Sequence, residues 1–195
     1  MENTPNDDQL RSELIKKHRD INVDYEWWDC LYDDFKVEML EKGITVDQIN
    51  FSGFYSQGDG ACFTGTVDMK VFLKMHDLEQ EFMGATFFAG QRELYATIDR
   101  THSSHYSHEY TVQVELHEDT YNDYDEDDLR CQVYGQMAAL LNEEWARLEE
   151  VVTSLCRAYM KGLYYRLRDE FEALTTDEAV WETIVANDLH VVEAV

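Results

Sequence analysis

The sequence predicts an α+β fold, in which an antiparallel sheet of four to five strands is packed by N-terminal and C-terminal helices. Apolar residues recur with a helical period before residue 43 and again after residue 129, and they alternate with polar residues in between. Strands that follow one another along the chain favour an antiparallel sheet with segregated helices. A chain of 195 residues fits a single domain over 1–195. We expect disorder over 1–8, helices over 9–43, mostly strands over 44–117, an acidic segment over 118–128 and helices over 129–188.

Two helices are expected before the first strand. Residues 8–20 form the first helix, and residues 25–42 form the second, with Asp24 as its N-cap and Gly43 at its end. Four side chains at helical spacing predict the buried face of the second helix: Trp28, Tyr32, Phe35 and Met39. Trp27 lies off this face, and we expect it to cover the sheet edge rather than to contact a partner.

The segment 51–65, FSGFYSQGDGACFTG, lies between two stretches of β-branched and aromatic residues that predict paired strands. Within it, Asp59 and Gly60 predict a tight hairpin, because glycine accepts the positive φ of such a turn. Gly53 and Gly65 lie inside the strand patterns and predict bulges or a close backbone approach. The motif loop consists of Ser56, Gln57, Gly58, Asp59 and Gly60.

Two interpretations of the motif loop remain open. A glycine loop can offer backbone N–H groups to a phosphate, but this one lacks the Lys and Ser/Thr of a P-loop, and Asp59 would repel an anion. The sequence favours a hairpin whose Ser, Gln and Asp side chains satisfy local backbone groups.

Three further elements are expected after the hairpin. Residues 70–76 continue the second strand, residues 77–90 form a short helix or an irregular crossing, and residues 93–100 and 110–116 form two more strands.

The loop over 101–109 contains a histidine at every third position. His102, His105 and His108 are therefore weak candidates for a metal site, since neutral imidazole binds zinc and nickel well. A solvated loop without a physiological metal is the favoured interpretation.

The acidic segment has three open interpretations: a solvated linker, a cap on the next helix, or a row of carboxylates that resembles the phosphates of a nucleic acid. In the third interpretation, tyrosines add flat apolar contact, and the segment binds a partner through Asp119, Tyr121, Asp123, Tyr124, Asp125, Glu126, Asp127 and Asp128.

The C-terminal part is predicted to be helical from residue 129 onward. One continuous helix would be too long for a compact domain of this size, so we expect a break over 149–153. Thr175 and Glu178 predict a capping box ahead of a helix over 179–186, and residues 189–195 could add a short edge strand. The buried face of the last helix is predicted to comprise Val180, Trp181, Ile184 and Val185.

The charge balance restricts the possible partners. There are 16 basic and 41 acidic residues, giving a net charge of −25. Such a chain repels nucleic acid and anionic membranes and attracts basic surfaces. Four widely spaced cysteines without a C-x-x-C pair indicate reduced, mostly buried thiols. We therefore expect a cytoplasmic protein without a membrane span or a cofactor.

The segments 25–65 and 157–188 resemble a widespread family of small phage and prophage proteins. Its members carry paired tryptophans, here Trp27 and Trp28, then a segment like FSGFYSQGDGACFTG, and end in a helix like LTTDEAVWETIVAND. Some relatives are named antitoxins. Residues 189–195 depart from the acidic, aromatic tail that the resemblance implies.

Together, charge and resemblance imply a phage-encoded acidic inhibitor in the host cell cytoplasm. It would bind the basic nucleic-acid-binding surface of a host defence complex, of anti-CRISPR or anti-restriction type, by mimicking nucleic acid. The alternatives are an antitoxin that masks a basic toxin, and a small hydrolase or metal-dependent enzyme that uses the motif loop with His105 and His108. No catalytic residue is assigned, and a homodimer remains open.

Overall fold

The computed structural model describes residues 7–91, 94–101, 106–118 and 142–192. The chain divides into two compact units. We call Met1–Tyr32 with Tyr165–Val195 the terminal unit, and Asp33–Tyr164 the sheet unit. Two helices, α2 (Asp29–Glu41) and α6 (Asn142–Leu174), belong in part to both units.

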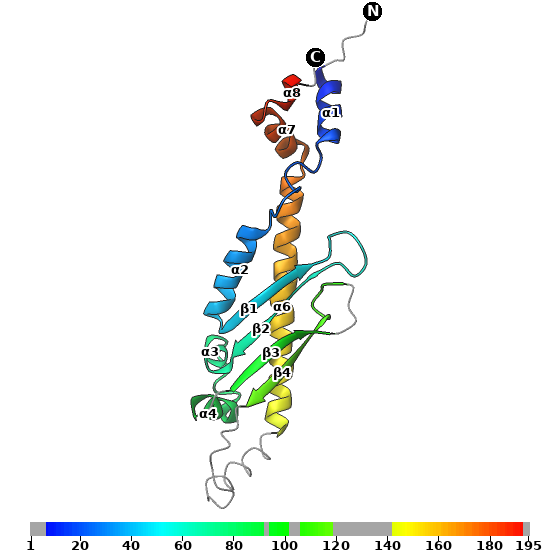
Figure 1. Cartoon of the computed structure of the whole chain (residues 1–195). Coiled ribbons are helices and arrows are strands. Elements are labelled where there is room, and N and C mark those ends of the chain that lie inside the picture. Colours follow the sequence, from blue (N-terminus) through cyan, green and yellow to red (C-terminus); the bar gives the residue numbers. More distant parts are fainter. Residues whose placement is uncertain (1–6, 92–93, 102–105, 119–141, 193–195) are drawn as a thin grey trace, which may run out of the picture. The chain divides into compact units, whose positions relative to one another are not determined.

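The sheet unit contains a four-stranded antiparallel sheet with the strand order β1-β2-β3-β4, which confirms the predicted fold class. The strands are β1 (Ile44–Phe51), β2 (Ala61–Asp68), β3 (Leu94–Arg100) and β4 (Val112–Glu118). Neighbouring strands in the sheet are also neighbours in sequence, as expected for a meander (Figure 1).

One face of the sheet is apolar and packed. Two rows of paired residues cross all four strands on this face: Ile44, Val67, Ala96 and Leu116, and then Val46, Gly65, Ile98 and Val114. The helix α6 runs behind the sheet in Figure 1, and Glu149 on this helix accepts a hydrogen bond from the backbone N–H of Leu116 at 3.3 Å. The buried stripe of α6 within this unit consists of Leu148, Val152, Cys156, Met160 and Leu163.

Position 65 in β2 requires glycine because the neighbouring strand approaches it closely. A Cβ there would overlap Thr45 O and would lie 3.1 Å from Val46 Cα, next to the bulge between Val46 and Gln48. The predicted close approach at Gly65 is therefore confirmed, whereas Gly53 lies in the loop after β1 with φ +104°.

The segment after β2 is a helix, so the prediction of a continued strand over 70–76 is wrong. The helix α3 (Met69–Met75) begins because the Asp68 side chain accepts hydrogen bonds from the backbone N–H groups of Lys70 and Val71, at 3.0 and 3.1 Å. A second helix, α4 (Met83–Gln91), confirms the helical alternative for the crossing to β3.

The second predicted helix starts later than expected. Trp27 and Trp28 lie in a turn, and α2 begins at Asp29, so Asp24 is not its N-cap. Phe35 is buried as predicted, with its ring 5.6 Å from that of Phe63 in β2, and Gly43 follows the helix with φ +81°.

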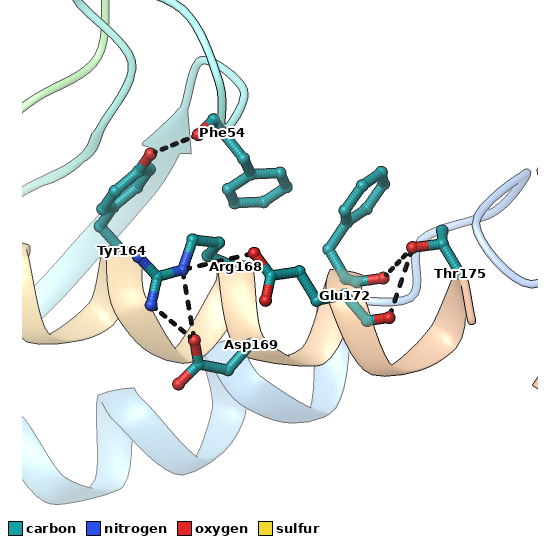
Figure 2. Close-up of polar contacts among 7 residues, drawn as sticks. Phe54, Tyr164, Arg168, Asp169, Glu172 and Thr175 are labelled. Carbon is teal, nitrogen blue, oxygen red and sulfur yellow. Dashed lines mark hydrogen bonds and ion pairs between the residues drawn. The ribbon is translucent and has the colours of Figure 1, made fainter.

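The predicted break over 149–153 is absent, because α6 is one helix of 33 residues. A break is required only if this helix lies within one compact unit, whereas α6 belongs to both units. Its buried stripe continues through the segment without a proline. Towards its end, Arg168 pairs with Asp169 at 2.9 Å and with Glu172 at 3.8 Å (Figure 2).

The terminal unit packs α1 (Asp7–Lys17) against α7 (Asp177–Ala186), followed by the short helix α8 (Leu189–Val192). Its core consists of Leu14, Ile15, Val180 and Ile184. The expected edge strand after residue 188 is therefore wrong, and Val185 is exposed rather than buried.

The N-cap of α7 is Thr176, not Thr175. The Thr176 hydroxyl accepts from the backbone N–H of Ala179 at 3.2 Å, whereas the Thr175 hydroxyl donates to Phe171 O at the end of α6 (Figure 2). The predicted capping box of Thr175 with Glu178 is therefore wrong, because the N3 residue after Thr176 is Ala179, whose side chain cannot accept a hydrogen bond. Among the described residues, no helix combines the length and apolarity required to cross a membrane.

Candidate functional site

The motif loop forms part of a wider connection than a tight hairpin. β1 ends at Phe51 and β2 begins at Ala61, so residues 52–60 all lie between the strands. The Asp59 carboxylate accepts from the backbone N–H of Ser56 at 2.6 Å, and Gly58 has φ +92°. Asp59 thus provides a hydrogen-bond acceptor for a backbone N–H group of its own loop. The hairpin interpretation of the motif loop predicted such a local contact. A carboxylate at this position disfavours a phosphate there.

This loop packs against the connection between β3 and β4. We call residues 52–60 and 106–111 the paired loops. Ser107 N donates to the Ser52 hydroxyl at 3.3 Å, which is also within 3.5 Å of Ser107 O. A Cβ on Gly60 would lie 2.8 Å from His108 Cα, so only glycine permits this approach. A Cβ on Gly58 would lie 3.0 Å from the Tyr106 ring.

The first of the paired loops is also held by α6. Tyr164 donates a hydrogen bond from its hydroxyl to Phe54 O at 3.1 Å, and the two rings lie 5.9 Å apart (Figure 2). The Phe54 ring stacks on Phe51 at 5.5 Å. These contacts fix the backbone of the loop next to its exposed residues.

Three tyrosines project from the paired loops into solvent. Tyr55 is 72% exposed, Tyr106 is 52% exposed and Tyr110 is 67% exposed. The Arg157 guanidinium from α6 lies 5.0 Å from the centre of the Tyr110 ring. Exposed aromatic residues on two packed loops at one end of the sheet were not expected from the sequence.

The structure brings His108 next to the motif loop, but their contacts are structural. His108 Nδ1 accepts from the backbone N–H of Tyr110 at 3.1 Å, and His108 O accepts from the Thr111 hydroxyl at 2.7 Å. Within the described residues, no hydrogen bond joins His108 to Ser56 or to Cys62, which is buried in β2. His108 therefore forms no nucleophile–base pair with Ser56 or Cys62 in the described structure.

Metal binding receives no support from the described part of the chain, where no group of three or more potential ligand side chains gathers. His102 and His105 lie outside the described residues. His117, on β4, stacks on Tyr95 at 5.2 Å and lies 3.1 Å from the Thr97 hydroxyl.

The second face of the sheet is open and polar. A row of paired residues crosses all four strands here: Thr45, Thr66, Thr97 and Glu115. The exposed carboxylates of the strands are Asp47, Asp68, Asp99 and Glu115. Within these four fully described strands the one Lys or Arg residue is Arg100, whose guanidinium donates to Tyr106 O and to the Ser107 hydroxyl. We call this side of the sheet the acidic face.

A cavity of about 460 Å³ borders the acidic face near α3 and α4. Val67, Ala89 and Leu94 give it an apolar lining, while Asp68 and Lys70 add opposite charges. A second cavity, of about 510 Å³, lies between α6 and the paired loops, and its lining includes Glu109, Tyr110, Glu149, Arg157 and Lys161.

The thiol of Cys156 is unsuited to act as a nucleophile. It is buried in the stripe of α6, and burial raises its pKa from 9.0 to about 12, so that it stays protonated. Burial also raises the pKa of Tyr159, with smaller contributions from Cys156 and Glu38. The Tyr159 hydroxyl lies 2.6 Å from His76 Nε2.

The predicted partner-binding residues of the acidic segment, from Asp119 to Asp128, lie outside the described residues. The acidic face was missed because its carboxylates are far apart in sequence and come to lie on one sheet only through strand pairing. Strand alternation would have revealed Asp68, Asp99 and Glu115, which occupy outward-facing positions, whereas Asp47 lies at the bulge of β1.

These features define an α+β protein with an open acidic sheet face and a pair of tyrosine-bearing loops that contact each other. Residues 27–177 match the family described as a domain of unknown function, DUF8835, and the chain belongs to that family. Comparison with curated proteins and with solved structures gave no match.

Proposed function

We propose that this protein is a phage-encoded inhibitor that binds the basic nucleic-acid-binding surface of a host defence complex, of anti-CRISPR or anti-restriction type. The phage origin rests on the resemblance of the FSGFYSQGDGACFTG segment. The mode of action rests on charge. A chain of net charge −25 is attracted to surfaces that have evolved to hold phosphates.

The observation that carries the proposal is the acidic face. Four exposed carboxylates lie on one side of the sheet, where they alternate with hydroxyl and amide side chains, and the single strand arginine is occupied by the paired loops. Carboxylates pair with arginine through charge-assisted, often bidentate hydrogen bonds, as phosphates do. A rigid sheet holds these groups at fixed spacing, which reduces the entropy lost on binding.

Such an interface would associate rapidly and would weaken with salt. Long-range attraction raises association rates, and its effect declines as the Debye length shortens from about 10 Å at 0.1 M salt to about 3 Å at 1 M. Nucleic acid and inhibitor would compete for the same surface, so inhibition would be stoichiometric.

The test is capture of host proteins by the tagged full chain at low and at high salt, read by mass spectrometry. Three substitutions neutralise the acidic face: Asp47→Asn, Asp99→Asn and Glu115→Gln. A control with the same charge change neutralises exposed residues of the terminal unit: Asp24→Asn, Glu26→Gln and Glu182→Gln. Asp68 is left intact because it caps α3.

We expect the tagged chain to capture a DNA- or RNA-binding complex that is retained at low salt and lost at high salt. The control should retain this complex, and the variant of the acidic face should lose most of it. Recovery of no basic partner at either salt would refute the proposal, and equal retention by both variants would exclude the acidic face. Recovery of a small basic toxin would identify the protein as an antitoxin instead.

A further inference from the structure

We propose that Tyr55, Tyr106 and Tyr110 form an arginine-binding surface, which supplies the specific contacts of the complex with the basic protein partner. This inference rests on the proposed function and extends it from the acidic face to the paired loops. The three rings are 72%, 52% and 67% exposed, and they come from two loops that contact each other directly.

The loops that carry these rings are rigidly built. The Tyr106 ring lies against Gly58, where even a Cβ would come within 3.0 Å of it. Phe54, which precedes Tyr55, accepts a hydrogen bond from the Tyr164 hydroxyl at its backbone carbonyl. The reciprocal contacts of Ser52 with Ser107 join the two loops. A rigid loop with tyrosines loses little conformational entropy on binding, since each tyrosine has only two side-chain torsions.

The composition of the paired loops is that of a protein-recognition surface. Residues 52–60 contain two serines and three glycines with Tyr55, and residues 106–111 contain Tyr106, Ser107 and Tyr110. Tyrosine provides a large amphipathic contact, while serine and glycine provide adaptable hydrogen bonds and close approach. Tyrosine and arginine are also the residues most enriched among those that dominate binding energy at interfaces.

Arginine is the group that fits this surface best. The electron-rich faces of aromatic rings attract cations, and the guanidinium also stacks on them in a planar arrangement that an ammonium group cannot adopt. Among the described residues, Arg157 makes this contact with Tyr110 and Arg168 makes it with Tyr165, each at 5.0 Å. Stacking by nucleic-acid bases is disfavoured because the net charge of −25 repels phosphates.

The paired loops also carry negative charge for a cationic partner. Glu109 lies between the second and third tyrosines, and Asp99 is exposed on β3 just before the second loop. The nearest strand cation, Arg100, is engaged by Tyr106 O and the Ser107 hydroxyl. Glu109 therefore provides a carboxylate on the same loop as Tyr106 and Tyr110, in a cavity that Arg157 and Lys161 also line.

The test compares a nine-residue polyarginine peptide with a nine-residue polylysine peptide, which carry equal charge, at one fixed ionic strength. The affinity of each peptide is measured for three proteins. These are the full chain, a variant with Tyr55→Ser, Tyr106→Ser and Tyr110→Ser, and the control Tyr25→Ser. Tyr25 is 62% exposed and lies in the terminal unit. A fourth variant, with all three loop tyrosines changed to phenylalanine, keeps the aromatic faces.

The native chain should bind polyarginine more tightly than polylysine, with each loop tyrosine contributing about a two- to fivefold difference. The serine variant should lose this preference, so that its affinity for polyarginine falls by a larger factor than its affinity for polylysine. The phenylalanine variant and Tyr25→Ser should keep the preference, and equal melting temperatures would show that the variants are folded.

Equal binding of the two peptides by the native chain would overturn the inference while leaving the proposed function intact. The same conclusion follows if the serine variant retains the preference. Binding of neither peptide would instead overturn the proposed function itself. Tight binding of a single-stranded oligonucleotide, lost in the serine variant, would assign the tyrosines to bases rather than to arginine.

Discussion

Replacement of Gly60 by alanine is the sharpest test of how the paired loops are built. The new methyl group would overlap His108 Cβ and would lie 2.8 Å from His108 Cα and 3.1 Å from Ser107 O. Ordinary contacts begin near 3.4 Å, so the two loops must separate by more than half an ångström. The obstructing atoms belong largely to backbone, which cannot rotate away as a flexible side chain can.

The cost of this separation can be estimated from its parts. Overpacking in a close-packed region costs about 1–3 kcal/mol. The hydrogen bonds between Ser52 and Ser107, already 3.3 and 3.5 Å long, would weaken further, and each is worth roughly 0.5–1.5 kcal/mol. We expect a total loss of about 2–3 kcal/mol, which lowers the melting temperature by roughly 4–12 °C for a chain of this size.

Thermal unfolding followed by circular dichroism measures this effect, and Gly162→Ala is the matched control. Gly162 lies in the middle of α6, where an added Cβ meets nothing within 4 Å. Alanine there should stabilise the chain by up to about 1 kcal/mol through its higher helix propensity. An unchanged melting temperature for Gly60→Ala would refute the packing of the paired loops.

Three further predictions concern other contacts. Thr176→Ala removes the N-cap of α7 and should cost about 0.5–2 kcal/mol in denaturant unfolding, measurably more than the same change would in an exposed loop. Tyr164→Phe removes the hydrogen bond to Phe54 O and should cost about 0.5–1.5 kcal/mol, with increased amide exchange in the loop after β1. Stability should fall as the pH rises above 9.0, because the unfolded Cys156 thiol loses its proton there while burial holds its folded pKa at about 12. This fall approaches about 1.4 kcal/mol per pH unit, and an equally steep fall in Cys156→Ala would assign it to other groups.

The sheet was predictable because its signals are local. Alternation of buried and exposed residues in β1, β3 and β4 matches a sheet covered on one side. The strand predicted over 70–76 proved to be the helix α3. Val71 and Leu73 lie two residues apart, as on one face of a strand, which favoured the wrong prediction. The spacing of Met69, Phe72 and Leu73, all buried, with Asp68 as N-cap, was the better signal.

The paired loops could not be predicted, because their contacts join distant segments. Ser52 meets Ser107 across 55 residues of chain, and the pairing depends on which strands become neighbours. The glycines were recognised as special positions, but the sequence does not say what approaches them. Gly60 faces His108 and Gly58 faces Tyr106, which only the assembled sheet brings close.

The length of α6 shows a different limit. The helical period was correctly recognised, but the inferred break depended on the size of a single compact domain. The division into a terminal unit and a sheet unit removes that restriction. A long helix shared by two units has the same local sequence signals as two shorter helices, so only the tertiary structure distinguishes them.

The most direct test of the account is competition between this protein and a DNA duplex for the captured partner complex. Fluorescence anisotropy of the labelled duplex should fall to its free value when one equivalent of the protein is added at low salt. The acidic-face variant, with Asp47→Asn, Asp99→Asn and Glu115→Gln, should displace the duplex much less than its charge-matched control. A duplex that stays bound to the complex when the protein is in excess would contradict nucleic-acid mimicry.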